Sequence, residues 1–136
     1  MKGFKGSIEK KTEANQNFRK VLYTSKHSQL VVMSLKPKEA IGLETHKGND
    51  QFFRIESGRG MCIIDGHEYK IKEGDGVIVP AGAKHNVINT DSRKKLKIYT
   101  IYSPPHHKDG IVRKTKKSAE EIKEHFDGKT TEKMKK

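Results

Sequence analysis

The stretch GDGVIVPAGAKHNVIN (residues 74–89) contains two runs of strand-forming residues with a turn between them. The first run, GVIVP, ends at Pro80, and Gly82 completes the turn signal PAGA. The second run, KHNVINT, again carries Val and Ile, which favour extended backbone. The stretch therefore predicts two strands joined by a turn, with His85 at the start of the second strand.

Short runs of this kind, separated by turn residues, continue on both sides of the stretch. The hairpin signal is clearest in IDGHEYKI, because Asp65 and Gly66 suit a tight turn between two strands. The predicted strands cover residues 19–24, 29–35, 41–46, 51–57, 59–65, 67–72, 76–80, 84–90 and 96–102. Many short strands of this kind predict an all-β fold, in which two packed sheets or a closed barrel leave few exposed edges.

Alternate residues of these strands are expected to face the interior of the barrel. They form its core and, near one end, shape a small and mostly apolar pocket. The residues predicted to face inward are Phe53, Ile55, Met61, Ile63, Val77 and Val79. Cys62 lies in the same apolar run, MCII, with no basic cluster beside it, and is predicted to be an inert packing residue.

The length of 136 residues is that of one domain. The barrel is predicted to span residues 19–112, between a partly flexible basic N-terminal arm at 1–18 and a basic tail at 113–136. No segment with helical periodicity is found before Lys114. In the tail, SAEEIKEHF predicts a short helix with Ser118 as its N-cap and Glu121 completing a capping box.

The formal net charge of +12 is concentrated at the two ends of the chain. Residues 1–22 carry six Lys/Arg against two acids, and residues 113–136 carry nine against five. No RNA-binding aromatic motif interrupts these runs, so we expect solvated tails and no specific nucleic-acid partner.

Cys62 is the single cysteine, which excludes an intramolecular disulfide framework and fits a reducing compartment. No apolar run has the length of a signal peptide or a membrane span, so we expect a cytoplasmic protein.

Side chains suited to metal binding occur in ETHKGNDQ (residues 44–51). Because residues two apart on a strand share a face, Glu44 and His46 are expected to project together. The turn KGND then reverses the chain, so that Gln51 begins a neighbouring strand beside them. His85 adds a fourth group from a distant strand.

The chain resembles the cupin superfamily, whose members are small jelly-roll barrels with two signature motifs. The second motif is met in full: Gly74, five residues, Pro80, one, Gly82, two, His85, three, Asn89. The resemblance covers about residues 23–105. It implies that this all-β chain folds as a cupin jelly-roll β-barrel.

The first cupin motif is met only in part. The chain keeps its second histidine as His46, its four-residue gap and its closing glycine as Gly58. It departs from the motif at three positions, because Glu44 replaces the first histidine, Gln51 replaces the usual glutamate and Lys38 replaces the opening glycine.

The resemblance implies a divalent metal ion held by Glu44, His46, Gln51 and His85. This set carries one negative charge, as the usual three-histidine, one-glutamate set does, because the carboxylate has moved from one motif position to another. Glu44, His46 and His85 form a two-histidine, one-carboxylate set that suits Fe(II), with Mn, Ni and Zn as alternatives. Gln51 is expected to give a weak carbonyl ligand or to bond a metal-bound water. The alternative is a cupin without metal, in which Glu44 and His46 form a hydrogen-bonded pair.

Three functions from different classes are consistent with these residues. The first is a metal-dependent enzyme acting on a small polar metabolite, either dioxygenase-like or sugar-phosphate isomerase-like, with Glu44 as a base in the second case. The second is a non-catalytic cupin that binds a sugar or an acid. The third is binding of an anionic polymer through the basic tails. Nothing in the sequence selects between enzyme and binding protein.

The remaining features are predicted to be structural. YSPPHHKDG (residues 102–110) is interpreted as an ordered loop over the barrel edge, with a lid that touches substrate as the alternative. His27, His67 and His125 lie in polar surroundings and are predicted to be surface residues. Phe52 is expected on the outside of its strand, under the N-terminal strand or a second subunit. The resemblance implies a homodimer formed by packed barrel faces.

Overall fold

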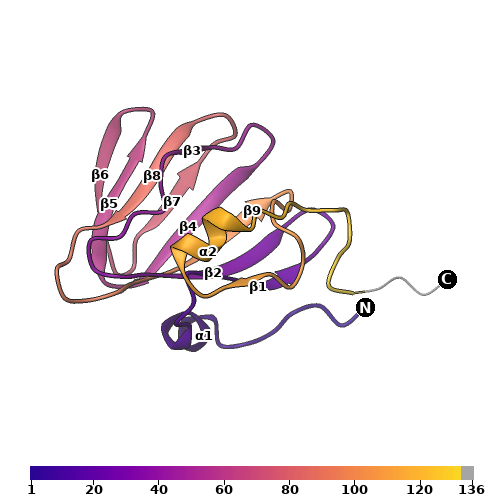
Figure 1. The fold of residues 1–136 in the computed structure, drawn as a ribbon. Coiled ribbons are helices and arrows are strands. Elements are labelled where there is room, and N and C mark those ends of the chain that lie inside the picture. The colour runs from indigo at the N-terminus through magenta and orange to yellow at the C-terminus, as the bar shows by residue number, and fades with distance from the viewer. Residues whose placement is uncertain (133–136) are drawn as a thin grey trace.

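The computed structural model describes residues 1–132, and its main feature is a pair of antiparallel β-sheets with short helices outside them (Figure 1). The larger sheet has the strand order β10-β1-β2-β9-β4-β7, and the smaller has the order β3-β8-β5-β6. The strands are β1 (Arg19–Thr24), β2 (Gln29–Leu35), β3 (Glu44–Thr45), β4 (Asp50–Ser57), β5 (Arg59–Ile64), β6 (His67–Lys72), β7 (Gly76–Val79), β8 (Lys84–Asn89), β9 (Leu96–Ser103) and β10 (Val112–Arg113). The helices are α1 (Ile8–Ala14) and α2 (Lys116–Glu121). Two sheets around one core confirm the predicted all-β jelly roll.

The core lies between the two sheets and follows the two-residue period of the strands. The register pairs Phe53 with Thr100 and Ile55 with Ile98, and all four side chains are buried. The core also reaches beyond the predicted barrel into the tail, through Ala119. Its members are Phe18, Val21, Val31, Met33, Leu35, Phe53, Ile55, Cys62, Ile71, Val79, Ala83, Val87, Leu96, Ile98, Tyr102, Ile111 and Ala119.

Asn89, the last residue of the stretch at 74–89, connects the end of β8 to two backbone segments, at residues 35–36 and 91–94. Its Nδ2 donates to the carbonyl oxygens of Leu35, Lys36 and Lys94, at 3.1, 3.0 and 2.9 Å. Its Oδ1 accepts from the backbone N–H of Asp91. Asn89 is fully buried, so these bonds replace the hydration that its amide and the three carbonyls lose on folding.

The predicted inward-facing residues are correct in β4 but wrong in β5. Met61 and Ile63 are only half-buried, whereas Cys62 is completely buried. Cys62 lies opposite the buried Val87 of β8, so its two neighbours must face outward. The run MCII is apolar throughout, so its pattern could not determine which residues face inward. Burial raises the pKa of the Cys62 thiol to about 11, as expected for an inert packing residue.

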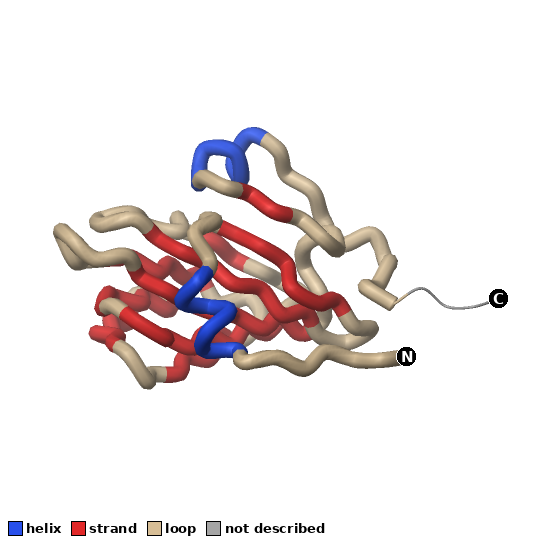
Figure 2. The backbone as a smooth tube through the Cα atoms, turned by 90° about the horizontal axis from the view of Figure 1, so that it is seen from below, coloured by secondary structure: helices blue, strands red, loops and turns tan. Residues whose placement is uncertain are grey.

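The helices differ from those predicted. Helix α1 forms within the predicted arm and packs against β2, β4 and β9 of the larger sheet (Figure 2). Only Thr12 is buried in this seven-residue helix, so no apolar stripe marks it in the sequence. The N-cap of α2 is Thr115 rather than Ser118, because the Thr115 side chain accepts from the Ser118 N–H. Neither helix of the described part of the chain is long and apolar enough to cross a lipid bilayer.

Two strands near the pocket also differ from the prediction. The strand expected at 41–46 is reduced to β3, with a single bridge between Ala40 and Ile88 before it. Strand β10 was not predicted, and it pairs with β1 through Lys20 and Val112. Two-residue strands lack the alternation on which sequence patterns depend.

Gly60 is a site where two backbones come too close for a side chain. A Cβ at this position would lie 2.2 Å from the carbonyl oxygen of Ile88. We expect Gly60→Ala to lower the free energy of unfolding by about 1–3 kcal/mol, measured by urea denaturation. Gly48→Ala is the matched control, because nothing lies within 4 Å of its Cβ position, and its change should stay below about 0.5 kcal/mol. Equal stability of the two variants would contradict this packing.

Candidate metal centre

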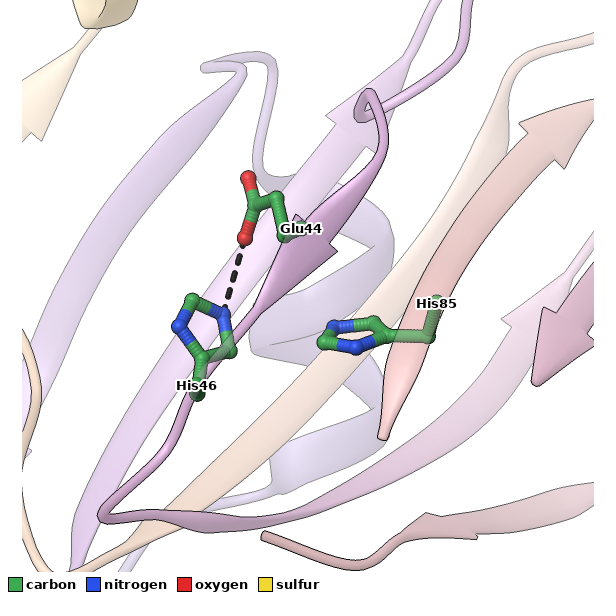
Figure 3. A group of neighbouring side chains, drawn as sticks. All are labelled: Glu44, His46 and His85. Atoms are coloured by element: carbon green, nitrogen blue, oxygen red, sulfur yellow. Dashed lines mark ion pairs between the residues drawn. The ribbon is translucent and has the colours of Figure 1, made fainter. Parts of the chain in front are cut away.

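The candidate site starts from the pairing of β3 with β8. The antiparallel register places Glu44 directly opposite His85, so the two side chains leave the sheet side by side. His46 comes two residues after Glu44 and projects on the same side. Figure 3 shows the three side chains directed toward one another, with His85 reaching across from β8. The structure thus brings together three of the four predicted ligand residues.

The atoms of these residues that could bind a metal converge on one point. One ligand atom from each of the three residues lies within 4.8 Å of the other two. Nε2 of His46 is 2.8 Å from Oε2 of Glu44, the contact dashed in Figure 3. This Nε2 is buried, yet no partner within residues 1–132 meets hydrogen-bond geometry. Adjacent ligands at metal bond lengths of about 2.1 Å lie ~3 Å apart, so the 2.8 Å spacing of the Glu44–His46 pair fits a shared cation.

The backbone determines which nitrogen of His85 faces the site. Nδ1 of His85 lies 3.1 Å from the carbonyl oxygen of Ala83. A carbonyl oxygen can only accept, so Nδ1 carries the proton and Nε2 keeps its lone pair. Hydrogen bonds of this kind orient most metal-binding histidines. His85 is 3% exposed, so few other orientations are open to it.

The turn between β7 and β8 positions His46 as well as His85. Gly82 has a φ of +89°, in the left-handed region that favours glycine. Its N–H donates to the carbonyl oxygen of His46 at 2.9 Å. One turn therefore holds the backbone of one histidine and leads directly into the strand of the other.

Gln51, the fourth predicted ligand, lies on β4 in the larger sheet and is 3% exposed. Its Nε2 donates to Oγ1 of Thr100 at 3.0 Å, which determines how the amide is turned. Its Oε1 is buried and meets no donor in the described part of the chain. An amide oxygen without a donor is the atom that Gln51 could offer to a cation or to a bound water.

The Glu44 carboxyl has surroundings that keep it ionised. Burial alone would raise its pKa, but contact with His46, followed by the charges of Arg19 and His85, brings the pKa below its usual value. Its side chain is 29% exposed, so part of the charge stays near water. A carboxylate must be ionised to bind a metal, so Glu44 meets this requirement at neutral pH.

Glu44 and His46 line a pocket of about 580 Å³, which is within the usual range of small-molecule sites. The buried His85 does not line this pocket. Charged side chains, Arg19 among them, line it together with apolar ones, so the prediction of a mostly apolar pocket is wrong. Helix α2 and the chain around it form one wall of the pocket.

A cluster of histidines lies next to His46 in this pocket. The ring centroids of His46 and His106 are 4.2 Å apart, and those of His106 and His125 are 5.8 Å apart. Burial, the largest cause, lowers the pKa of His106 to about 4 and that of His107 to about 2, so both are neutral at pH 7. His125 is exposed, as predicted, but it too lines the pocket. The only sequence signal for this wall was the histidine pair after two prolines.

The loop that carries His106 and His107 is held by Gln29, which is 1% exposed. Oε1 of Gln29 accepts from the backbone N–H of His106 and of His107, at 3.1 and 2.9 Å. Its Nε2 donates to the carbonyl oxygen of His107 at 2.7 Å. The segment is therefore the ordered loop that was predicted. It also forms part of the pocket wall, where the alternative, a lid that touches substrate, would have to lie.

Comparison of the sequence with known protein families shows which family the chain belongs to. The family model described as "Cupin domain" matches residues 31–102, which is more than half of the chain. The chain belongs to the cupin family. As a cupin, it carries Glu44, His46 and His85 inside the matched segment, whereas Arg19 and the pocket wall after residue 103 lie outside it.

Similar proteins extend this result. The uncharacterized protein YrkC of Bacillus subtilis (strain 168) is 43% identical over 124 residues, which cover 87% of this cupin and 66% of YrkC. The chain thus spans just under two thirds of that relative. A solved structure from Bacillus halodurans has a TM-score of 0.86 at 38% identity, over 89% of this chain and 96% of that one. The Oxalate-binding protein of Thermotoga maritima (strain ATCC 43589) is 29% identical over 90 residues, covering 66% of this chain and 71% of its own.

Replacing Gln29 should loosen the histidine wall. Gln29→Leu leaves two backbone N–H groups and one carbonyl oxygen without partners, so we expect a loss of about 2–4 kcal/mol in the free energy of unfolding. Hydrogen exchange at His106 and His107 should become faster. Lys26→Leu, at an exposed residue of the turn between β1 and β2, is the control and should change stability by less than about 0.5 kcal/mol. Unchanged exchange at residues 106–107 would contradict this anchoring role.

Proposed function

We propose that this cupin binds one divalent metal ion through Glu44, His46 and His85 and acts on a small polar metabolite in the adjoining pocket. The observation that carries the proposal is the convergence of three ligand atoms within 4.8 Å, with the buried Nε2 of His46 lacking any other partner in the described residues. Nε2 of His46 lies 2.8 Å from Oε2 of Glu44 but outside hydrogen-bond geometry, so a cation that accepts a lone pair from each atom would stabilise the site.

The donor set favours particular metals and a particular chemistry. Two neutral imidazoles and one carboxylate are typical of Fe(II) sites, and Mn, Ni and Zn accept the same ligands. When bound, such an ion supplies a Lewis acid and, if it is Fe(II), the ability to react with oxygen. We assign Gln51 a supporting role, because its buried Oε1 has no donor among residues 1–132 and Thr100 holds the amide in place.

The chain's own residues bind and orient the metabolite. Glu44 and His46 line the pocket, so a ligand in the pocket can contact these two members of the centre. His106 and His107, neutral and held by Gln29, form a wall beside His46 that can donate or accept hydrogen bonds without adding charge. We propose a dioxygenase-like oxidoreductase, because the two-histidine, one-carboxylate set leaves coordination positions for substrate and oxygen.

The second candidate function is a non-catalytic binding protein. The printed name of the Thermotoga maritima relative, Oxalate-binding protein, supports this alternative and makes oxalate the first acid to test. An isomerase-like reaction stays a third possibility, in which Glu44 serves as the base instead of a ligand.

Oxygen consumption separates enzyme from binding protein. With Fe(II) bound, the enzyme proposal predicts oxygen uptake with at least one member of a panel of diols, thiols and small acids, recorded with an oxygen electrode. The uptake should disappear in His85→Ala. Tight binding of a panel member with no oxygen uptake would instead favour the binding protein.

We also propose a cytoplasmic homodimer. The single cysteine, buried and unpaired, fits a reducing compartment. Ile78 is 69% exposed on β7, opposite the half-buried Phe52 of β4, so the outer face of the larger sheet offers apolar surface for a second subunit.

Metal content tests the centre directly. Protein purified without a histidine tag and reconstituted with Fe(II), Mn, Ni or Zn should hold about one ion per chain, measured by mass spectrometry of the elements. Each of Glu44→Ala, His46→Ala and His85→Ala should lose most of this metal, because each removes one ligand atom of the group. His67→Ala, at an exposed histidine of β6, is the matched control and should keep it. Full metal retention in His46→Ala or His85→Ala would rule out the site.

A further inference from the structure

The pocket beside the centre is built largely from segments outside the matched cupin domain. Residues 31–102 supply the lining residues at 41–46, whereas Phe18 and Arg19 come from before that segment and the lining residues between 106 and 125 come from after it. Strand β10 pairs with β1, which joins the two flanks at the edge of the pocket. The flanks therefore shape the space in which a ligand meets the centre.

Arg19, the first residue of β1, has a buried nitrogen without a partner. Its Nε is buried and meets no hydrogen-bond acceptor within residues 1–132. In that same part of the chain, Arg19 takes part in no ion pair. A buried donor without an acceptor costs free energy, so an acceptor on a ligand would stabilise Arg19.

The neighbour of Arg19 across the strand pair is another arginine. The register places Arg19 opposite Arg113, and like charges in this position repel each other. Arg113 is compensated within the chain, because its Nη2 lies 3.1 Å from Oε1 of Glu124 and its Nε donates to the carbonyl oxygen of Ile122. Arg19 forms no such ion pair; its charge acts on Glu44, whose pKa it helps to lower, and its guanidinium carbon lies 5.4 Å from the centroid of the Phe18 ring. Both arginines line the same pocket.

Other cationic side chains of the pocket add to the positive electrostatic potential that Arg19 creates there. Lys116 and Lys123 also line it, and the carboxylates of the lining are partly engaged elsewhere, since Glu124 pairs with Arg113 and Lys108. The neutral His106 and His107 add no charge of their own at pH 7. A positive pocket wall attracts an anion.

We propose that Arg19 binds the carboxylate of a small ligand whose other end faces the Glu44–His46–His85 centre. A guanidinium group can donate two parallel hydrogen bonds to a carboxylate, and Arg19 lines the pocket without forming an ion pair within residues 1–132. The orientation of the ligand rests on the proposed metal function, whereas its negative charge is inferred from Arg19 and the other cations of the pocket, independently of any metal. Arg19 is thus the specificity-determining residue of the pocket.

Calorimetric titration of the full chain tests this assignment. The probes are malonate, pyruvate and oxalate, with inorganic phosphate as a second kind of anion, added to protein reconstituted with Zn and to metal-free protein. Arg19→Gln should weaken carboxylate binding about 10- to 100-fold and leave zinc content unchanged. Arg19→Lys keeps the positive charge but lacks the planar guanidinium group that donates two parallel hydrogen bonds, so its carboxylate affinity should lie between those of Arg19→Gln and the wild type. Lys20→Gln, at the next and exposed residue of β1, is the matched control and should bind as the wild type does.

The outcomes distinguish this inference from the proposed function. The assignment is overturned if Arg19→Gln and the wild type bind carboxylates with equal affinity and thermal denaturation shows that both proteins are folded. The same holds if the zinc-loaded wild type binds none of the carboxylates, or if Arg19 is needed only for phosphate. Failure of the wild type to retain zinc counts against the metal centre instead. In that case Arg19→Gln must still weaken carboxylate binding to the metal-free protein for the inference to stand.

Discussion

The pairing of the two-residue strand β3 with β8 is the constraint on which the candidate centre depends. It sets Glu44 opposite His85, and the hydrogen bond from Gly82 to the carbonyl oxygen of His46 holds the third member beside them. Because the side chains of directly paired residues lie close together, a carboxylate at position 44 can reach the same point as an imidazole from β8. The geometry of the group thus follows from backbone hydrogen bonds more than from contacts among its side chains.

This arrangement explains how the carboxylate can stand at position 44 while an amide stands at 51. Gln51 is 3% exposed, and a neutral amide is buried there at far lower cost than a carboxylate without a compensating cation. Glu44 is 29% exposed and lies in the fields of Arg19, His46 and His85, which favour its ionised form. The group keeps one negative charge, placed where solvation and neighbouring cations help to hold it.

The flanks of the barrel have a larger role than their composition suggests. Their composition predicts basic, solvated tails, yet Phe18 and Ala119 join the core, and residues around them line the pocket. The charge of these segments is therefore not only a matter of solubility. Arg19 and Arg113 lie opposite each other across β1 and β10; Arg113 pairs directly with Glu124, whereas Arg19 forms no ion pair within the described chain and acts on Glu44 only through its charge.

The sequence by itself determined the fold, because alternating apolar residues and turn residues at regular spacing specify strands, and the stretch at 74–89 matches a whole motif. It also predicted that Glu44, His46 and His85 come together, since the first two are two residues apart and the third lies in that motif. Only the tertiary structure decided that Cys62 rather than Met61 faces the core. In an unbroken apolar run, the sequence does not show which alternate residues face inward, and the pairing with β8 determines it. Likewise, Arg19 and His106 reach the pocket through long-range strand pairing and the Gln29 anchor, contacts that no local pattern of residues encodes.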